Sequence, residues 1–400
     1  MDAIRRDFPS LKRKVNNKPC IFLDGPAGTQ VPDYVIDAMT HYYHHSNANK
    51  HGAFATAQET DVMMTATRST VATFLGAEGG HNISLGQNMT TLNYSLARAI
   101  GRHLQPGDEI LITQLDHEAN RGPWLSLRSE GIIVKEVNML KSGRLDYDDF
   151  AEKINEDTRL VCMGWSSNIT GTVNDVKLAR KLTHKVGAWL LVDAVHYAPH
   201  YKIDVTAMGF DFLLCSAYKF YGPHVGILYS KTGLLDQLPT DRLRTASQKA
   251  PYSIETGTLN HAAMAGVKAS IEYLAQLGDG DFLQDRLEDA MIKIGKHESR
   301  LAKMLYDGLK GIDEVKIIGP SFSKGQRAPT ISFVHKRYKA SEICKVLAEH
   351  NIFAWSGHFY VVRATEVLGL YEHGGVTRLG ISAYIKEDEI KKTLKVIKSL

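Results

Sequence analysis

The sequence predicts an α/β protein with two domains. Between about residues 80 and 230, short and nearly continuous apolar runs alternate with longer amphipathic stretches. This alternation is typical of a mostly parallel sheet that helices cover on both faces. After about residue 260 the apolar residues recur at helical spacing instead. A chain of 400 residues is also long enough to form two domains with separate cores.

Four apolar runs in the first part of the chain are expected to form buried strands. They lie at residues 110–112, 160–163, 189–192 and 212–215. The amphipathic segments at 119–130 and 176–185 predict helices between these strands. Because each strand is followed by a helical segment, neighbouring strands are expected to run parallel.

The C-terminal part predicts a smaller α/β domain. Helical spacing extends over residues 262–312, where Leu301, Leu305 and Leu309 share one face. We expect a strand at 330–334 and a helix at 341–350. The last helix is expected to begin near Lys386 and to carry apolar residues at helical spacing, namely Ile390, Leu394 and Ile397.

No internal repeat, low-complexity tract or long linker marks a boundary in the sequence. The change of periodicity therefore sets the predicted division into domains. The large domain is expected to span residues 21–261. The small domain is expected to combine residues 1–20 with 262–400.

Composition argues against several functional classes. The net charge is only +4 and the basic residues are scattered, so neither a nucleic acid nor a membrane surface is the expected partner. The charged N-terminal segment does not resemble a signal peptide, and no apolar run approaches the ~20 residues of a membrane helix. The four cysteines have no metal-binding or disulfide spacing. A reducing, cytoplasmic location is therefore expected.

Polar residues follow each of the four predicted strands. In open α/β sheets, ligands bind outside the carboxyl ends of the strands. The sequence therefore predicts a cofactor site at this edge of the sheet. Its candidate residues, strand by strand, are Asp116, His117, Glu118 and Asn120, then Ser166, Ser167 and Asn168, then Asp193 and His196, and finally Ser216, Tyr218 and Lys219.

Lys219 and Asp193 together indicate pyridoxal 5'-phosphate (PLP). A lysine beside low-dielectric walls loses part of its preference for the charged form, so its amine becomes available for imine formation. A carboxylate at the end of a strand can hold a pyridine nitrogen protonated and make the ring an electron sink. Separately, Asp193 reads as a strand cap and Lys219 as a surface lysine. Their positions after neighbouring strands favour the cofactor interpretation.

A phosphate site is predicted where Asn88, Met89 and Thr90 open a helix. The free N–H groups and the dipole of a helix N-terminus favour an anion. Many helices begin with such residues as plain caps, so this pattern alone is weak. The hydroxyl of Ser216 is a second candidate donor. His117 could lie flat on the cofactor ring, although a single histidine is more often structural.

The order of these residues resembles a known family. From end to end the chain is similar to the class V aminotransferases of PLP fold type I. Within that family it resembles the cysteine desulfurases and selenocysteine lyases. The matching segments are Asp7-Phe8-Pro9, Phe22-Leu23-Asp24-Gly25-Pro26-Ala27, Gly107-Asp108-Glu109-Ile110, His117-Glu118-Ala119-Asn120, Ser167-Asn168-Ile169-Thr170-Gly171-Thr172, Val192-Asp193-Ala194-Val195-His196, Ser216-Ala217-Tyr218-Lys219, Glu255-Thr256-Gly257-Thr258 and Thr377-Arg378-Leu379-Gly380.

The resemblance implies a role for each candidate residue. It makes Lys219, His117 and Asp193 the catalytic residues. Arg378 and Asn168 would bind the substrate, because a guanidinium holds a carboxylate with two parallel hydrogen bonds. Thr258 would reach the phosphate of the neighbouring subunit, which implies a homodimer, and the substrate would be an amino acid, a small molecule. The implied cofactor-binding residues are Asn88, Met89, Thr90, His117, Asn168, Asp193, His196, Ser216, Lys219 and Thr258.

The chain also departs from the family. Tyr218 and His196 stand where a histidine and a glutamine are usual, and Asn88-Met89-Thr90 replaces a threonine-rich run. Desulfurases carry a nucleophilic cysteine on a loop before the substrate arginine. Here the segment 355–363 has none, and no cysteine follows Cys344. Passing sulfur to a protein thiolate requires that nucleophile.

We therefore expect cleavage of a C–S or C–Se bond by elimination, without a persulfide on the enzyme. Epimerisation and transamination start from the same carbanion, and fold does not choose among these outcomes. A PLP-binding protein without catalysis is a further alternative. So is a metal enzyme that uses His41, His44 and His45, although no carboxylate accompanies these residues and exposed helix histidines are commoner.

Overall fold

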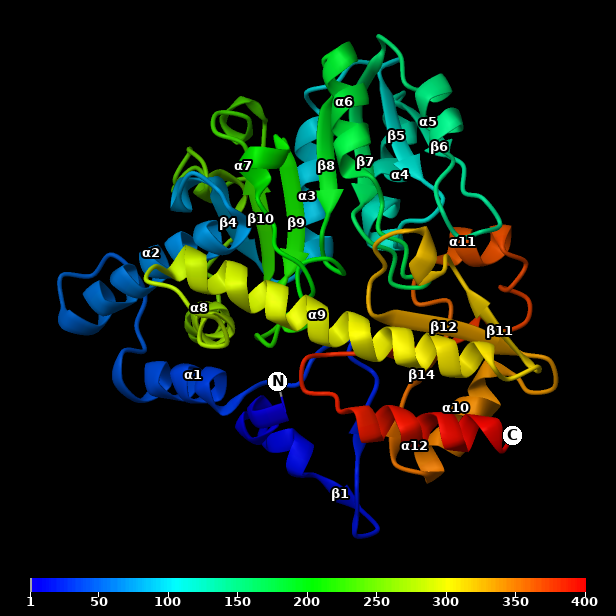
Figure 1. The fold of residues 1–400 in the computed structure, drawn as a ribbon. Coiled ribbons are helices and arrows are strands. Elements are labelled where there is room, and N and C mark those ends of the chain that lie inside the picture. The colour runs from blue at the N-terminus through cyan, green and yellow to red at the C-terminus, as the bar shows by residue number, and fades with distance from the viewer. Residues whose placement is uncertain (1) are drawn as a thin grey trace.

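The computed structural model describes residues 2–400. It contains a seven-stranded sheet and a four-stranded sheet, and helix α9 (Leu283–Lys310) runs between them. In Figure 1 the larger sheet occupies the upper half of the molecule, and α9 crosses below it towards the smaller sheet. One end of α9 packs against helix α8 (His261–Ala275), and the other end packs against the small sheet.

The large sheet confirms the predicted α/β class. Five of its strands are parallel, while β10 pairs antiparallel with both β9 and β4. All four strands predicted from apolar runs are present, as β5, β7, β8 and β9. Across the sheet, the order is β4 (Ile83–Gly86), β10 (Gly226–Ser230), β9 (Phe212–Ser216), β8 (Trp189–Asp193), β7 (Thr158–Gly164), β5 (Glu109–Thr113) and β6 (Ile133–Val137).

Both faces of this sheet are buried, as near-continuous apolar strands require. Ile110 and Ile112 pack in a cluster that includes Leu96. Leu111, between them, belongs to a second cluster on the opposite face. The helices around the sheet are α2 (Ala55–Leu75), α3 (Met89–Gly101), α5 (Tyr147–Lys153), α6 (Val176–Val186) and α7 (Val205–Met208).

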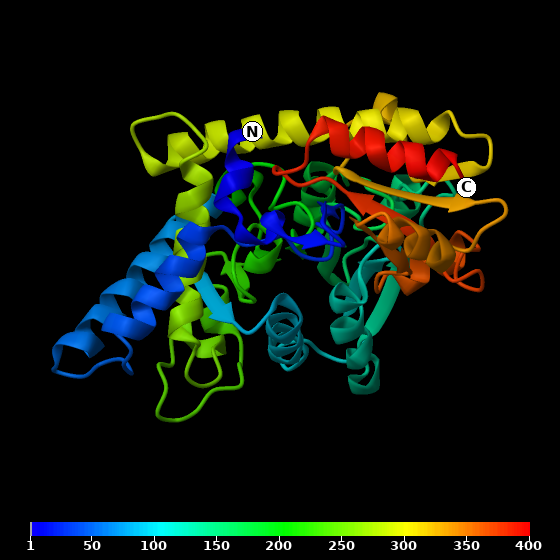
Figure 2. The ribbon, with the colours of Figure 1, turned by 90° about the horizontal axis from the view of Figure 1, so that it is seen from below.

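The small sheet is antiparallel throughout. Figure 2 shows α12 beside α9 along one side of the molecule, and these two helices are in contact. The predicted strand at 330–334 and helices at 341–350 and after Lys386 are confirmed as β12, α10 and α12. The elements of this part are β11 (Val315–Ile318), β12 (Thr330–His335), α10 (Ala340–Glu349), β13 (Ile352–Phe353), β14 (Trp355–Gly357), α11 (Val362–Val367), β15 (Val376–Gly380) and α12 (Glu387–Lys398).

One predicted helix differs from the structure. The segment 119–130 is not one helix but three short turns, η4 (Glu118–Asn120), α4 (Gly122–Leu125) and η5 (Ser126–Glu130). Pro123 lies among them, and a proline clashes with the carbonyl group four residues earlier, so a continuous helix cannot pass through it. The stretch 262–312 forms the two helices α8 and α9. Gly280, with a φ of 147°, lies in the connection between them.

The division into domains at residues 21 and 261 stays a prediction, and two contacts cross it. Strand β3 (Ile21–Phe22) pairs with β13, which precedes the small sheet. Helix α8 packs against α2 and α1 (Asp33–His45). In both Figure 1 and Figure 2, α1 and α2 project from one end of the molecule, away from the small sheet. Across the described residues, no helix is both long and apolar enough to cross a bilayer.

Candidate active site

One cavity at the carboxyl ends of β5, β7, β8 and β9 collects most of the predicted site. Nine of the ten residues predicted to bind the cofactor line it. The tenth, Thr258, lines a neighbouring cavity together with Gly86, Gln87 and His224. The nine residues are Asn88, Met89, Thr90, His117, Asn168, Asp193, His196, Ser216 and Lys219.

Lys219 follows β9 in the short turn η6 (Ala217–Lys219). Its Nζ donates hydrogen bonds to the carbonyl oxygens of Pro26 and Ala27, the latter at 3.1 Å. Burial, together with the charge of Arg378, lowers the pKa of the Lys219 amine to about 7, although the charge of Asp193 acts in the opposite direction. Near neutral pH a large share of this amine is therefore uncharged, as a nucleophile must be.

Asp193 is the last residue of β8 and is buried. Its Oδ1 accepts a hydrogen bond from the backbone N–H of Val195 at 2.9 Å. Burial raises the pKa of Asp193 to about 6, although the Val195 N–H and the charge of Lys219 act against this increase. A buried carboxylate is stabilised by a positively charged partner, which a protonated ring nitrogen would supply.

Asp116 is a second buried carboxylate in the same cavity. Its Oδ1 accepts from the backbone N–H of Gly164 at 2.7 Å, and its Oδ2 accepts from Nδ2 of Asn120 at 3.3 Å. Burial raises the pKa of Asp116 to about 7, and the charge of Asp193 contributes to this increase. The sequence analysis placed Asp116 at the end of a strand but assigned it no role. Because Asp116 directly precedes His117, a predicted cofactor-binding residue, it could have been predicted to belong to the site.

His117 caps the turn η4, and its Nδ1 accepts a hydrogen bond from the backbone N–H of Ala119 at 3.0 Å. Burial lowers the pKa of His117 to about 4, with further contributions from the charges of Lys219 and Arg378. The ring is therefore neutral at physiological pH. A neutral imidazole beside the cavity can pack against another ring without bringing in a charge.

Helix α3 begins at the cavity, as the sequence predicts. Asn88 caps it, because its side-chain Oδ1 accepts from the backbone N–H of Thr91 at 2.9 Å. The backbone N–H of Met89 donates to Oγ of Ser216 at 3.2 Å. The first turn of a helix leaves N–H groups without helical partners. Asn88, Met89 and Thr90 thus provide N–H groups that could bind an anion next to the hydroxyl of Ser216.

Arg378 is buried in β15 and is not among the residues that line the cavity, but it contacts Asn168, which does line it. Its Nη1 donates to the backbone oxygen of Asn168 at 3.2 Å. Burial lowers the pKa of Arg378 to about 9, while Asp24 acts in the opposite direction. Desolvation of this cation makes a negatively charged ligand, such as a carboxylate, favourable beside it.

His196 and Tyr218, the two unusual residues, both line the cavity and have protein partners. His196 Nε2 lies 2.9 Å from Oγ1 of Thr330 in β12. Burial holds the pKa of His196 well below its ordinary value. The Tyr218 ring stacks on His224 with centroids 4.6 Å apart. His196 therefore links the large sheet to the small one.

Residues 358–361, which we call the mouth loop, lie against the cavity. Asn168 Nδ2 donates to the backbone oxygen of Phe359 at 3.2 Å, and the backbone N–H of Glu118 donates to the backbone oxygen of Tyr360 at 2.7 Å. The guanidinium of Arg378 lies 3.7 Å from the ring centre of Phe359. The sequence marked this segment only for its lack of cysteine. Its aromatic residues contact parts of the chain that are distant in the sequence, so no local sequence pattern could have predicted these contacts.

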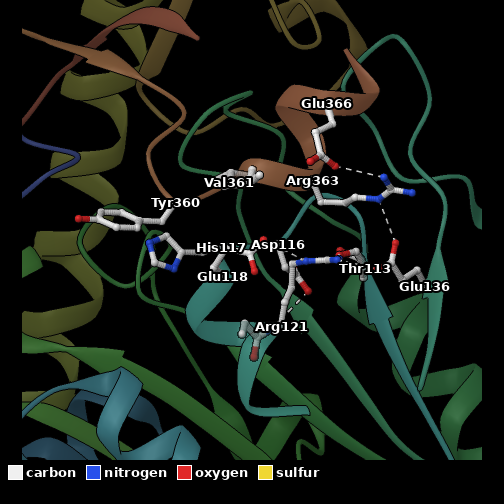
Figure 3. A network of polar contacts seen from close by, with 12 residues as sticks. Thr113, Asp116, His117, Glu118, Arg121, Glu136, Tyr360, Val361, Arg363 and Glu366 are labelled. Atoms are coloured by element: carbon white, nitrogen blue, oxygen red, sulfur yellow. Dashed lines mark hydrogen bonds and ion pairs between the residues drawn. The ribbon is translucent and has the colours of Figure 1, made fainter. Parts of the chain in front are cut away.

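An ion-pair network fixes the chain just after the mouth loop (Figure 3). Arg363 Nε lies 3.1 Å from Glu136, and Arg121 Nη2 lies 2.7 Å from the same carboxylate. Burial opposes ionisation of Glu136, but the hydrogen bonds and charges of Arg121 and Arg363 keep its pKa below the usual value. Arg121 itself is buried and also donates to the backbone oxygen of Thr113. The network ties α11 to the large sheet.

The fold and this cavity define the class of the protein. A mostly parallel sheet presents a lysine of lowered pKa, a buried carboxylate and a helix N-terminus at one edge, as PLP enzymes of fold type I do. Residues 21–393 match the family model described as Aminotransferase class-V. The chain belongs to this family, and it is an enzyme of the PLP-dependent class.

Relatives and solved structures agree with this assignment. A "Probable cysteine desulfurase" of Mycolicibacterium paratuberculosis is 34% identical over all of the chain, which spans 58% of that relative's length. A "Cysteine desulfurase" of Yersinia pseudotuberculosis is 30% identical, with 98% of the chain and 96% of the relative covered. The apo structure of the cysteine desulfurase from Thermococcus onnurineus NA1 matches with a TM-score of 0.89 and 26% identity, over 99% of the chain and 97% of that structure.

PLP is the cofactor of this family, and the cavity fits it. The hydroxyl of Ser166 lines the cavity and is buried, and it has no hydrogen-bond partner within the described residues. Such a group requires a ligand or water, because a buried polar atom without a partner is costly. Together with the amine of Lys219, the carboxylate of Asp193 and the N-terminus of α3, it provides groups for each polar part of the cofactor.

Proposed function

We propose that the protein cleaves the bond between Cβ and a sulfur or selenium atom of an amino acid by elimination. The observation that carries this proposal is the segment 355–363, which has no cysteine and whose Phe359 and Tyr360 contact Asn168 and His117, two residues that line the cavity. The names of the desulfurase relatives support sulfur-containing amino acids as the substrate class. PLP, when bound, supplies an electron sink for the carbanion at Cα.

In this proposal Lys219 moves the proton. With the cofactor bound, the Lys219 amine would be the group that removes the proton from Cα of the substrate. The pKa of about 7 suits this task, because a base works best when its pKa lies near the working pH. Asp193 would hold the ring nitrogen of the bound cofactor protonated, and the neutral imidazole of His117 would border the cofactor.

Other residues position the two ligands. Arg378 and Asn168 bind the substrate carboxylate, which is favourable because the buried guanidinium has lost its hydration. The remaining groups would hold the cofactor in place: the N-terminus of α3 and a neighbouring hydroxyl would bind its phosphate, and a further histidine would border its ring. These residues are Asn88, Met89, Thr90, Ser216 and His196.

The bond changes balance without any cysteine of the enzyme. The Cβ–S bond breaks and sulfur leaves with its electron pair, then takes a proton and departs as a thiol or sulfide. The remaining aminoacrylate reacts with one water molecule to give pyruvate and ammonia. A desulfurase that forms a persulfide would instead release alanine and retain the sulfur on a cysteine.

The thiols of this chain support the proposal. Cys162 and Cys215 are buried in β7 and β9, and burial raises the pKa of both thiols well above the ordinary value. Burial likewise raises the pKa of Cys344, in α10, to about 11. A thiol with a raised pKa is a poor nucleophile near neutral pH, because the thiolate is the reactive form.

We also propose a cytoplasmic homodimer in which Thr258 completes the phosphate site of the partner. Thr258 lines a cavity that includes Gly86 and Gln87, just before the N-terminus of α3. Large apolar side chains are exposed on or next to α1 and α2, where a partner subunit would cover them. They are Tyr34, Ile36, Tyr43, Phe54 and Val62. Four free cysteines suit a reducing compartment.

A product assay tests the function. Purified holoenzyme is incubated with cysteine, selenocysteine, cysteine S-conjugates and pairs of amino and keto acids. We expect pyruvate, ammonia and a free thiol in equal amounts from a β-substituted substrate, without alanine. Alanine with a protein-bound persulfide would overturn the proposal. So would racemised substrate, or amino-group transfer to a keto acid, as the only product.

A further inference from the structure

We propose that Tyr360 forms a binding site for the substituent on the substrate's sulfur, and that the substrates are cysteine S-conjugates with a planar aromatic group. This inference rests on the proposed elimination and names its substrate class. It starts from the mouth loop, whose aromatic side chains line the approach to the predicted carboxylate-binding residue.

The backbone of the mouth loop is strained at two neighbouring positions. Phe359 has a φ of 51° and Tyr360 a φ of 57°. Bulky residues seldom adopt this left-handed conformation, which costs about 1 to 3 kcal/mol at each position. Such strain persists only where the surroundings hold it, and it is common at binding sites.

Contacts with the sheet edge and within the loop hold this conformation. The backbone oxygens of Phe359 and Tyr360 accept from Asn168 and from the backbone N–H of Glu118, as described above. The backbone N–H of Tyr360 donates to Nδ1 of His358 at 3.1 Å. The loop is therefore fixed to both segments that carry predicted ligand-binding residues, 117–120 and 166–172.

The two aromatic side chains take different positions. The Phe359 ring covers the guanidinium of Arg378 at 3.7 Å, so it borders the predicted carboxylate site. The Tyr360 ring lies beside His117, with centroids 5.4 Å apart, and Figure 3 shows these two residues next to each other. Tyr360 is nevertheless 68% exposed, so most of its ring surface is free for another group.

An aromatic row continues from Tyr360 away from the cavity. The rings of Tyr360 and His358 have centroids 6.1 Å apart, and His358 stacks on Tyr371 at 5.8 Å with an angle of 26°. Tyr371 is 43% exposed. Together with His117, these residues provide ring surfaces from the cofactor cavity to the protein surface.

This arrangement favours a planar apolar substituent over a free thiol. A substrate whose amine replaces Lys219 and whose carboxylate binds Arg378 is bordered by the mouth loop. A free thiol or selenol is too small to use the exposed ring of Tyr360. An aromatic group on sulfur would pack on that ring in an offset or edge-to-face geometry. The rings of His358 and Tyr371 could contact the part of such a substituent that extends beyond the cavity.

The test compares two substrates that differ in the sulfur substituent. Holoenzyme is assayed for pyruvate with S-phenyl-L-cysteine and with S-methyl-L-cysteine. The variant is Tyr360→Asn, because asparagine tolerates the left-handed backbone while removing the ring. We expect the ratio of kcat/KM values, phenyl over methyl, to fall about 3- to 10-fold, the value of one aromatic pair. Dividing the ratio of the variant by the ratio of the unmodified enzyme cancels the difference between the two leaving groups.

Two further variants make the test specific. Tyr360→Phe keeps the ring and should retain the ratio of the unmodified enzyme. Tyr338→Ala removes a tyrosine of the small domain that is 38% exposed, and it should leave the ratio unchanged. A second readout is equilibrium binding of L-homophenylalanine against L-norvaline, which carry CH2 in place of sulfur and cannot eliminate a thiol. Tyr360→Asn should weaken binding of the first about 3- to 10-fold more than binding of the second.

The outcomes separate this inference from the proposed function. If both substrates yield pyruvate but Tyr360→Asn leaves the two ratios unchanged, the Tyr360 site is wrong and the elimination stands. If Tyr360→Phe loses the preference, the hydroxyl rather than the ring is responsible, and the proposed stacking is overturned. If no β-substituted amino acid yields pyruvate, the elimination itself is wrong.

Discussion

The pKa of Lys219 leads to a quantitative prediction about cofactor binding. An ordinary lysine has a pKa of 10.5, whereas the pKa of Lys219 is lowered to about 7. At pH 7 this gap raises the uncharged fraction of the amine from about one in 3,000 to about one half. Only the uncharged amine attacks the aldehyde of PLP. We therefore expect the rate of cofactor uptake, divided by the rate for a free lysine derivative at the same pH, to be largest below pH 7 and to fall above it.

The sign follows from the two titrations. Below pH 7 both amines gain uncharged form about tenfold per pH unit, so the ratio is constant. Between pH 7 and 10 Lys219 gains no more, while the free amine still does, so the ratio falls about tenfold per unit. Stopped-flow absorbance on cofactor-free protein measures the uptake, and the division removes the ionisation of PLP itself.

Two variants test the causes of the shift. Arg378 lowers the pKa of Lys219, so Arg378→Met should move the break to higher pH. Asp193 raises it, so Asp193→Asn should move the break to lower pH. A ratio that stays constant up to pH 10 would refute the lowered pKa. If the ratio begins to fall near pH 7 in both variants as well, the effects assigned to the charges of Arg378 and Asp193 would be refuted.

Other predictions concern the site and the assembly. Borohydride reduction of the holoenzyme should attach the cofactor to Lys219, and peptide mapping that finds it on another lysine would overturn the assignment. Replacing all four cysteines by serine or alanine should leave turnover largely intact in protein that folds and binds PLP; loss of activity in such protein would identify a cysteine as sulfur acceptor. Thr258→Ala should weaken PLP binding in a dimer seen by light scattering, whereas a fully active monomer would contradict the shared site. Glu136→Gln should raise KM for S-phenyl-cysteine more than for S-methyl-cysteine, because it loosens the mouth loop that holds the Tyr360 ring in place; equal factors would argue against a positioning role.

Much of the fold was predictable because it depends on local patterns. The strands β5, β7, β8 and β9 are apolar on both faces, so their sequence reads as buried parallel strands. The broken helix at 119–130 was missed because periodicity outweighed one residue, Pro123, in the prediction. Most residues of the cavity lie directly after these strands. Because the carboxyl ends of parallel strands meet at one edge of the sheet, the sequence could predict that these residues lie close together.

The rest of the site depends on contacts between distant parts of the chain. Asp116 follows the same rule as Asp193, but its raised pKa requires Gly164 and Asp193 to lie beside it. Nothing in the local sequence indicates that Phe359 covers Arg378, because β15 and the mouth loop meet only in the folded protein. The missing cysteine, by contrast, was visible in the sequence alone.

The contacts of the mouth loop explain how a desulfurase fold could change its chemistry. An enzyme that collects sulfur on a loop cysteine needs that thiol to reach the substrate and then an acceptor. Here Glu118 and Asn168 hold the loop backbone, and Glu136 ties the following residue Arg363 to the sheet. A fixed wall of aromatic side chains cannot carry sulfur away, but it can bind the group attached to sulfur while the C–S bond breaks. If elimination is the reaction, the leaving thiol takes that group with it, and the exposed ring of Tyr360 lies where it departs.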